Sequence, residues 1–386
     1  MRIKHIFLTI AILVTFACGK NDGPLGPDEP ETPTETGKPA WTTPELAFAF
    51  PETELKRYSY CPVVLQQENG DRYVFMCANP YADPSASLYN TIIDNIYMFI
   101  EHPDGTRTEA KSVLQPGEAY DNHHVCDPSV IEGEFKMDGA VYKYAMFYTT
   151  GIKEYDYCEL AVAFSNDLNA DKWVKYTEGP IVKKTWAGEG DLQWSGGNCW
   201  GVGQPSAISL DGKGKVLLTY SIGDLNGTRV AYRFIDMSDM SRLDMGTQRS
   251  MITNGLKQSN GSQDIASNLD FALDREHDRI IMVRDVRPFP ATYPTFIPST
   301  MEVMYLSFSG FQDNVGTWKK LAQITPELTG FPRNHNAGFV RDNFGYISDY
   351  TKPTIYFTVS KQAPDVYESE NLMCCWTYDI YKTTYK

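Results

Sequence analysis

A repeat of about 66 residues constrains the fold of this chain more than any other feature of its sequence. Five segments share one pattern: a small or polar residue, often before Pro, then a short apolar strand, a turn and a second apolar strand. The segments open, in chain order, at Cys61, Asp127, Gln204, Asp270 and Asn336. These positions are 66, 77, 66 and 66 residues apart. Because the spacing is so even, the pattern predicts an array of equal β units.

Each unit continues with more strands. A third alternating strand is seen at 160–164 and at 230–234, and Trp173 and Trp318 mark a fourth strand in two units. Four antiparallel strands with Gly and Asp turns and 13% aromatic residues are typical of a β-propeller blade. The prediction is an all-β fold, a five-bladed β-propeller of four-stranded antiparallel blades, over residues 41–386. A pair of β-sandwiches is the alternative, although it would not explain the regular period.

The N-terminus predicts export. Residues 1–17 combine a basic start with an apolar run of 12 residues, Ile6 to Ala17, which is typical of a signal peptide and short for a membrane span. Cys18 follows in a context that resembles a bacterial lipobox, so we expect it to be lipidated, with plain secretion as the alternative. Residues 18–40 are rich in Pro, Glu, Thr and Gly and predict a flexible tether.

The charge of the chain limits its partners and its location. The net charge of −14 becomes −16 once the positive charges of Arg2 and Lys4 leave with the signal peptide. Such a surface repels nucleic acid and anionic membranes at long range, so we expect no nucleic-acid partner. No other segment is apolar enough to cross a membrane, so we expect a membrane contact through the lipid only. We also expect a monomer. The acidic stretch after Cys18 resembles a surface-export signal. We therefore expect an outer-membrane lipoprotein on the cell surface, with the periplasmic face as the alternative.

The seven cysteines after Cys18 show no paired metal-ligand spacing. Neither a metal site nor a cofactor is therefore expected. A structural cation in the central channel, held by His335, stays open as an alternative. Cys61 and Cys126 are expected to be near neighbours. They could be packing residues, form a disulfide or form a thiol site.

Three motifs carry a family resemblance. They are Asp127-Pro128-Ser129-Val130, the run 163–168 with Trp173, and Gln204-Pro205 with the turn Asp211-Gly212. Together they resemble the five-bladed glycosidases, above all the arabinofuranosidases and xylosidases of glycoside hydrolase family 43. The resemblance implies a base aspartate at the first opening, a second aspartate at the third opening and an acid glutamate in the fourth blade. This chain has Cys61, Gln204 and Asp270 at the corresponding openings.

The resemblance implies a carbohydrate-active enzyme for polysaccharide utilisation. Hydrolysis by inversion needs two carboxyl groups several ångströms apart. We predict that Asp127 and Asp270 form a relocated acid/base pair acting on a plant or host polysaccharide or oligosaccharide, with Glu189 as a further catalytic candidate. The alternative is a non-catalytic glycan-binding propeller descended from such an enzyme.

Polar and aromatic residues near the unit openings are the candidates for carbohydrate binding. The loop 186–200 contains three tryptophans among Gly and polar residues, which suits stacking on sugar faces. The predicted binding residues are His123, His124, Trp194, Trp200, Gln204, His335 and Asn336.

Overall fold

β-Strands make up nearly all of the regular structure in the computed structural model of the chain. The structure describes residues 41–50, 58–79, 94–152, 155–184, 200–224, 226–291, 297–361 and 377–386, which belong to one unit, Pro39–Lys386. The helices in these ranges are short: η1 (Met240–Arg242), α2 (Phe308–Gln312) and α3 (Pro326–Thr329). No helix of the described residues is long and apolar enough to cross a membrane.

Antiparallel pairing groups the strands of the described residues into five runs of four. The first three runs are β2 (Ser59–Gln66), β3 (Arg72–Ala78), β4 (Asn95–Glu101) and β5 (Lys111–Leu114); β6 (His124–Met137), β7 (Ala140–Ile152), β8 (Tyr155–Ser165) and β9 (Val174–Lys175); and β10 (Gly201–Ser209), β11 (Lys215–Asp224), β12 (Gly227–Asp236) and β13 (Arg249–Ser250). The last two are β14 (Asp270–Asp274), β15 (Arg279–Asp285), β16 (Met301–Ser307) and β17 (Lys319–Ile324); and β18 (Asn334–Arg341), β19 (Thr354–Lys361), β20 (Thr377–Thr384) and β1 (Glu45–Phe48). The predicted hairpins and third strands therefore exist as strands.

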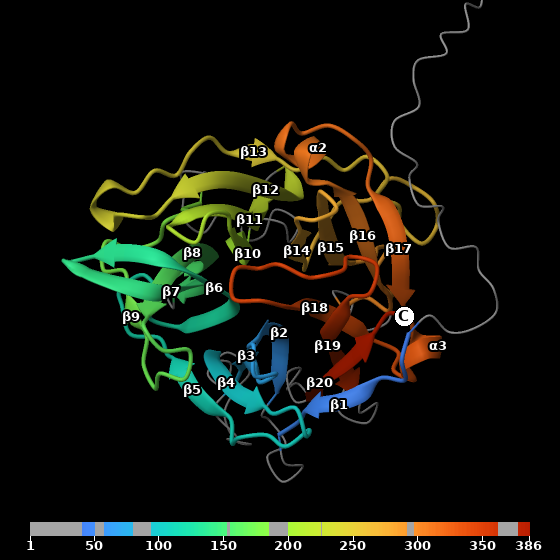
Figure 1. Ribbon diagram of the computed structural model, residues 1–386. Helices are drawn as coiled ribbons and strands as arrows, with labels where there is room; N and C mark the ends of the chain where they lie inside the picture. Colours follow the sequence, from blue (N-terminus) through green and yellow to red (C-terminus); the bar gives the residue numbers. More distant parts are fainter. Residues whose placement is uncertain are drawn as a thin grey trace, which may run out of the picture. The chain divides into compact units, whose positions relative to one another are not determined.

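Strand β1 completes the last run from the start of the unit. It pairs with β20, so the two ends of the unit share one sheet (Figure 1). A parallel pair between β18 and β2, at Val340↔Val64 and Arg341↔Leu65, then joins the last run to the first. These two pairings link the beginning and the end of the unit by backbone hydrogen bonds.

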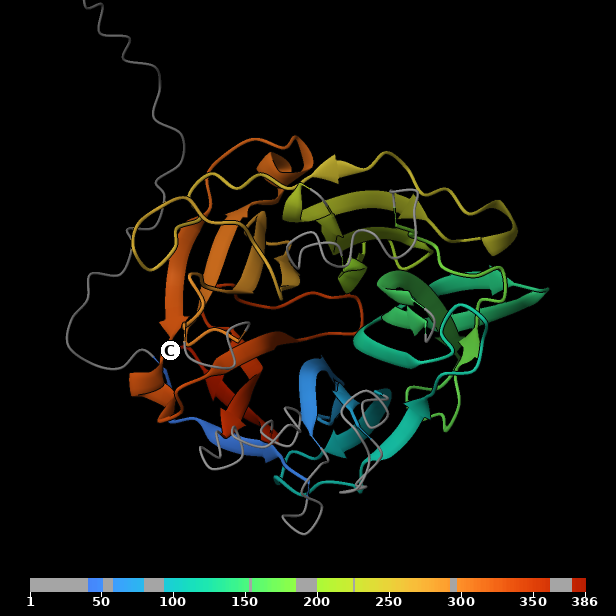
Figure 2. The same ribbon diagram turned by 180° about the vertical axis from the view of Figure 1, so that it is seen from behind.

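Within the described ranges, the core is divided into five clusters, one between each successive pair of runs. The cluster with Val64 and Phe99 of the first run also contains Tyr356 and Ile380 of the last run. The last run therefore packs against the first. Figures 1 and 2 show the runs arranged round a centre from both sides. Because each sheet is covered on both faces, strands such as β3 are apolar along most of their length rather than alternating.

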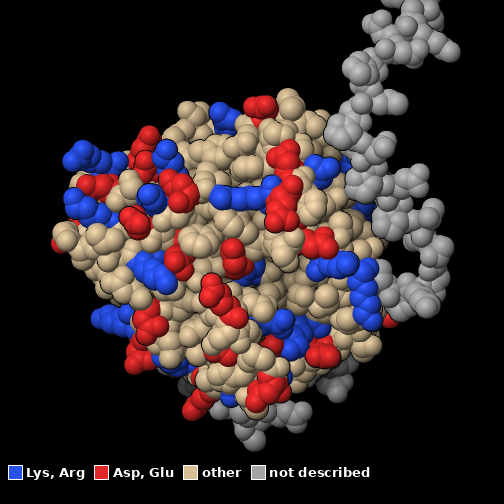
Figure 3. Space-filling view, in the orientation of Figure 1, with Lys and Arg blue, Asp and Glu red and all other residues tan. Residues whose placement is uncertain are grey.

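The charged side chains of one face are mixed rather than segregated. Figure 3 shows Lys and Arg interspersed with Asp and Glu on the face seen in Figure 1. Proteins that bind nucleic acid usually carry a basic patch or stripe. Figure 3 shows no such stripe among the described residues of this face.

Candidate functional site

The innermost strands of the five runs meet in one pocket. It has a cavity volume of about 40 Å³ and is lined by Cys61, Pro62, Val63, Asp127, Pro128, Gln204, Pro205, Asn268, Leu269, Asp270, Asn336 and Ala337. All five predicted opening residues are among these, and each run contributes at least one of them. We call this cavity the axial pocket.

A left-handed residue marks the same place in every run. Positive φ angles between 46° and 53° occur at Cys61, Asp127, Gln204, Asn268 and Asn336. In β2, β6, β10 and β18 this residue lies at a register shift, where the strand bulges. Bulges redirect side chains, and non-glycine residues with positive φ are uncommon, so a local strain recurs around the pocket. The prediction that Asp270 opens the fourth unit is therefore wrong, because Asn268 holds that position.

Asp270 lies two residues further along, where it links neighbouring strands. Its carboxylate accepts hydrogen bonds from the Ser206 hydroxyl (2.6 Å) and from the Phe339 backbone N–H (2.9 Å). Ser129 and Ser206 have the same linking role in the two preceding runs, where each hydroxyl oxygen accepts a backbone N–H of the next inner strand at 3.0 Å. Both oxygens of Asp270 are thus occupied. These bonds give Asp270 a structural role, and the expected acid/base pair with Asp127 stays a prediction.

Arg341 brings a positive charge to the centre of the ring. Its side chain is fully buried, and it extends from β18 to the Phe271 carbonyl in β14 (2.7 Å) and the Ser129 hydroxyl in β6 (3.1 Å). The Asp270 carboxylate lies 3.4 Å away. The guanidinium group therefore contributes a buried positive charge where the inner strands β6, β14 and β18 meet.

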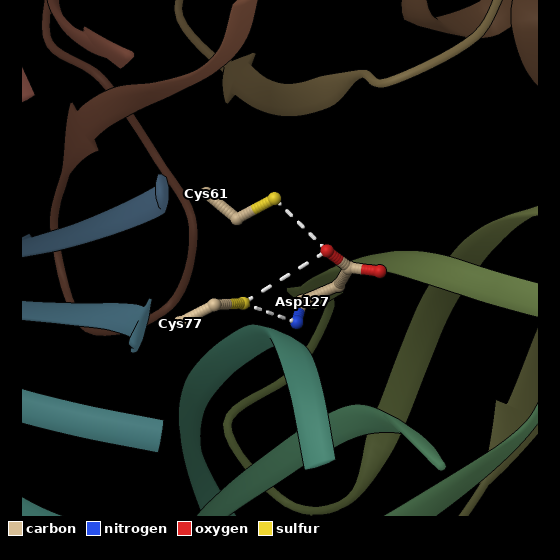
Figure 4. Close-up of side chains that lie close together, drawn as sticks. All are labelled: Cys61, Cys77 and Asp127. Carbon is tan, nitrogen blue, oxygen red and sulfur yellow. Dashed lines mark hydrogen bonds between the residues drawn. The ribbon is translucent and has the colours of Figure 1, made fainter. Parts of the chain in front are cut away.

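Asp127 is surrounded by sulfur. The Cys61 thiol donates to Oδ1 (2.9 Å) and the Thr149 hydroxyl donates to Oδ2 (3.0 Å), while the Asp127 backbone N–H donates to Cys77 Sγ (2.8 Å). Figure 4 shows the side chains of Cys61, Cys77 and Asp127 pointing toward one another. Burial raises the pKa of the Asp127 carboxyl, and the hydrogen bonds from Cys61 and Thr149 act against it. Burial likewise raises the pKa of the Cys61 thiol.

A second polar cluster adjoins this one. The Cys126 sulfur lies 3.8 Å from Asp127 Oδ2 and 4.0 Å from His124 Nδ1, which in turn is 3.8 Å from Asp94 Oδ2. Gly151 leaves the space for the His124 ring, since a Cβ at this position would come within 1.5 Å of His124 Cδ2. Among the described residues, this cluster and the trio Cys61, Cys77 and Asp127 are the two groups whose ligand atoms lie close enough together to hold a metal ion.

On the side of the fourth and fifth runs, His335 and Asp285 form a pair. His335 Nδ1 lies 2.6 Å from Asp285 Oδ2, which also accepts from the Asn268 amide at 2.7 Å. Gln204 is hydrogen-bonded to Asn268, so the network extends to the pocket lining. Asp285 is fully buried, and its Oδ1 has no hydrogen-bond partner among the described residues. Such an arrangement orients the imidazole ring through Nδ1. His335 is itself not among the lining residues and adjoins the pocket through its neighbour Asn336.

The other predicted residues are placed as follows. His123 stacks edge-on against His124 and donates its backbone N–H to the Gly151 carbonyl. Trp200 is partly buried, and its indole N–H donates to Thr228 at 3.4 Å. Asn336 lines the pocket. Glu189, Trp194 and the lipidation site Cys18 lie outside the described residues.

Cys77 and Asp285 are candidate residues that the repeat pattern misses. Both stand near the ends of second strands, β3 and β15, which the pattern treats as apolar. Thr149 occupies a similar place in β7 and donates to Asp127. A thiol, hydroxyl or carboxyl group recurring at the end of a second strand is the signal that could find such residues.

Comparison with known proteins identifies structures with a similar fold but no relative by sequence. No family model matches the chain, and no curated protein matches it. Solved structures do: a family 117 glycoside hydrolase from Zobellia galactanivorans matches with a TM-score of 0.56 at 11% identity, over 89% of each chain. The fold is that of propeller-like glycoside hydrolases.

Two further solved structures agree. The catalytic domain of the Coprinopsis cinerea family 62 α-L-arabinofuranosidase matches with a TM-score of 0.55 at 10% identity, over 89% of this chain and 96% of that one. An N-acetylgalactosamine deacetylase from F. plautii, in complex with blood group B trisaccharide, matches with a TM-score of 0.55 at 13% identity, over 89% and 95%. One fold therefore carries different reactions on sugars, and the reaction of this chain must be argued from its own site.

Proposed function

We propose that this protein is a glycan-directed hydrolase, built as a five-bladed β-propeller, whose reaction takes place in the axial pocket. The five antiparallel runs and the five core clusters between them support the number of blades. The shared fold with glycoside hydrolases supports a sugar substrate. The pocket suits such a substrate, because amide and carboxylate groups of Asp127, Gln204 and Asn336 line it and can bond sugar hydroxyls.

The hydrolytic step of the proposal rests on the His335–Asp285 pair. In the proposed reaction, Nε2 of His335 takes a proton from a water molecule as the water oxygen bonds to the anomeric carbon. The bond between that carbon and the leaving oxygen breaks, the leaving oxygen takes a proton from a second water molecule, and the hydroxide so formed takes the proton back from Nε2. Asp285, buried and 2.6 Å from Nδ1, orients the ring and compensates the charge of the imidazolium that forms.

This proposal does not use the carboxyl pair of Asp127 and Asp270, because Asp270 is bonded between neighbouring strands through both of its oxygens. The same observation favours the second candidate function, a glycan-binding propeller without turnover. That alternative needs only the polar lining of the pocket and not the His335–Asp285 pair.

Product analysis separates the two functions. We expect the wild type to release products from at least one oligosaccharide in a panel prepared from plant and host polysaccharides. His335→Gln should lower the rate by at least about 100-fold, the lower end of the usual contribution of a general base, while glycan-array binding persists. His277→Gln is the matched control, since His277 Nδ1 also contacts a carboxylate, Asp274 at 2.8 Å, on an exposed turn. Binding by the wild type without products across the panel would favour the second function.

The cellular setting belongs to the proposal. We infer that the chain is anchored to the outer membrane through lipid on Cys18, faces the cell surface and works as a monomer on glycans supplied from outside. Cys18→Ser should move the protein from the membrane fraction to the soluble fraction of the cell, because the acyl chains provide the anchor. A variant that still sediments with membranes would contradict the lipid anchor.

A further inference from the structure

We propose that Cys61, Cys77 and Asp127 bind a zinc-class metal ion at the edge of the axial pocket. The three side chains come from β2, β3 and β6 and point toward one another (Figure 4). This inference deepens the proposed function. Metal binding itself does not depend on that function, whereas the catalytic role of the ion rests on it. The inference replaces the expectation that no metal is bound, which depended on spacing along the chain.

The distances suit such an ion. In a tetrahedral zinc site, bonds of about 2.3 Å to sulfur and about 2.1 Å to oxygen place these atoms about 3.6 Å apart. Asp127 Oδ1 lies 2.9 Å from Cys61 Sγ and 3.9 Å from Cys77 Sγ, and the three ligand atoms all lie within 4.8 Å of one another. Two thiolates with one carboxylate are ligands that zinc prefers over magnesium or calcium. Both oxygen-to-sulfur distances therefore lie within about 0.7 Å of the separation that such an ion requires.

Neighbouring groups already orient the ligands. The Thr149 hydroxyl donates to Asp127 Oδ2, which leaves Oδ1 on the side of the two sulfur atoms. The Asp127 backbone N–H donates to Cys77 Sγ at 2.8 Å, a bond that favours a thiolate over a thiol. Contacts of this kind fix the ligands of metal sites and tune their affinity. The Thr149 hydroxyl and the Asp127 backbone N–H would thus act as outer-shell groups that orient the ligands.

The position of the site leaves one coordination place toward the pocket. Cys61 and Asp127 both line the axial pocket, whereas Cys77 is buried behind them. Zinc sites with three protein ligands and one open place are typical of catalysis, since the fourth place takes water or a substrate oxygen. An ion here would stabilise negative charge on the leaving oxygen, which the His335 base does not protonate directly.

The adjoining group of Asp94, His124 and Cys126 is the competing site. Two tyrosine hydroxyls outside the group hold the oxygens of Asp94, Tyr58 at 2.6 Å and Tyr60 at 2.8 Å. The bond to Asp127 Oδ1, in contrast, comes from Cys61, which is itself a proposed ligand. The single sulfur of the competing group also makes it the poorer site for a thiophilic ion. We therefore assign the ion to the trio Cys61, Cys77 and Asp127.

Metal binding can be measured without any substrate. The purified full-length protein, reduced and then freed of reductant without air, is titrated with Zn²⁺ against a competing chelator and with Co²⁺ by absorption spectroscopy. We expect one tight Zn²⁺ per chain and a sulfur-to-cobalt charge-transfer band. Cys61→Ser and Cys77→Ser should each weaken Zn²⁺ binding by at least about 100-fold and remove most of the band. Thr149→Val should weaken binding by about 10–100-fold, the usual effect of losing an outer-shell partner.

Two serine variants serve as controls. Cys126→Ser tests the competing group, and Cys158→Ser removes a free cysteine that belongs to neither group. Both should keep the ion. No tight Zn²⁺ in the wild type, binding lost in Cys126→Ser but not in Cys61→Ser, or a disulfide between Cys61 and Cys77 in the protein as isolated would each overturn the proposal. A protein that binds Zn²⁺ and releases no products would leave the metal site standing and reject the proposed hydrolysis alone.

Discussion

Replacing Asp285 by Asn is expected to lower kcat by two to four orders of magnitude on any substrate the wild type cleaves, with KM changed by less than about threefold. General-base catalysis contributes about 10²–10⁴-fold, and a buried carboxylate behind the histidine supplies the charge that the imidazolium needs. Asp285 is not among the pocket-lining residues, so substrate binding should persist. Steady-state kinetics of the purified variant measure both quantities.

The Asn substitution is chosen because it can keep the local bonds. Its side-chain oxygen can accept from His335 and Asn268 as Oδ2 of Asp285 does, while the amide group takes the place of Oδ1, which has no partner among the described residues. A stability loss should therefore stay small, and circular dichroism with a chemical unfolding curve checks it. Unchanged kcat in a folded variant, or a rise in KM that accounts for the whole effect, would show that Asp285 does not support a base.

Replacing Arg341 by Met is expected to reduce the free energy of unfolding by about 3–5 kcal/mol. Removing one partner of a buried ion pair leaves the other charge uncompensated, and this cost exceeds the worth of the pair itself. Here the Asp270 carboxylate 3.4 Å away would lose its counter-charge, and the Phe271 carbonyl and Ser129 hydroxyl would lose a donor. The midpoint and slope of urea unfolding measure the change.

Two variants of Asp270 make this prediction specific. Asp270→Asn should cost a similar amount, about 3–5 kcal/mol, because it leaves the buried Arg341 guanidinium without its counter-charge, although Asn still accepts the Phe339 N–H. Asp270→Ser combined with Arg341→Met should recover some of the loss, since serine holds the matching place at positions 129 and 206. If Asp270→Asn abolished turnover and left stability unchanged, Asp270 would be a catalytic group and its structural assignment would be wrong.

The contrast between Asp127 and Asp270 shows how far the repeat pattern reaches. Both were predicted to open a unit, and both line the pocket. Only Asp127 has the left-handed backbone of the opening position, and Asn268 takes that position in the fourth run. A spacing of 66 residues between hairpins cannot resolve a shift of two, because the apolar pattern of a strand repeats every two residues. The side-chain bonds of Asp270 then decide its role.

The sequence by itself determined the repeating units, the place of their inner strands and the residues that gather at the pocket. These follow from local chemistry: apolar strands must be covered on both faces, and turns of Gly and Asp separate them. Only the tertiary structure decided which side chains meet. His335 bonds Asp285 50 positions away, and Cys61 and Cys77 reach Asp127 from another run across 66 and 50 positions. Such contacts depend on register, on a bulge in each inner strand and on the packing of one run against the next, none of which is encoded in spacing along the chain.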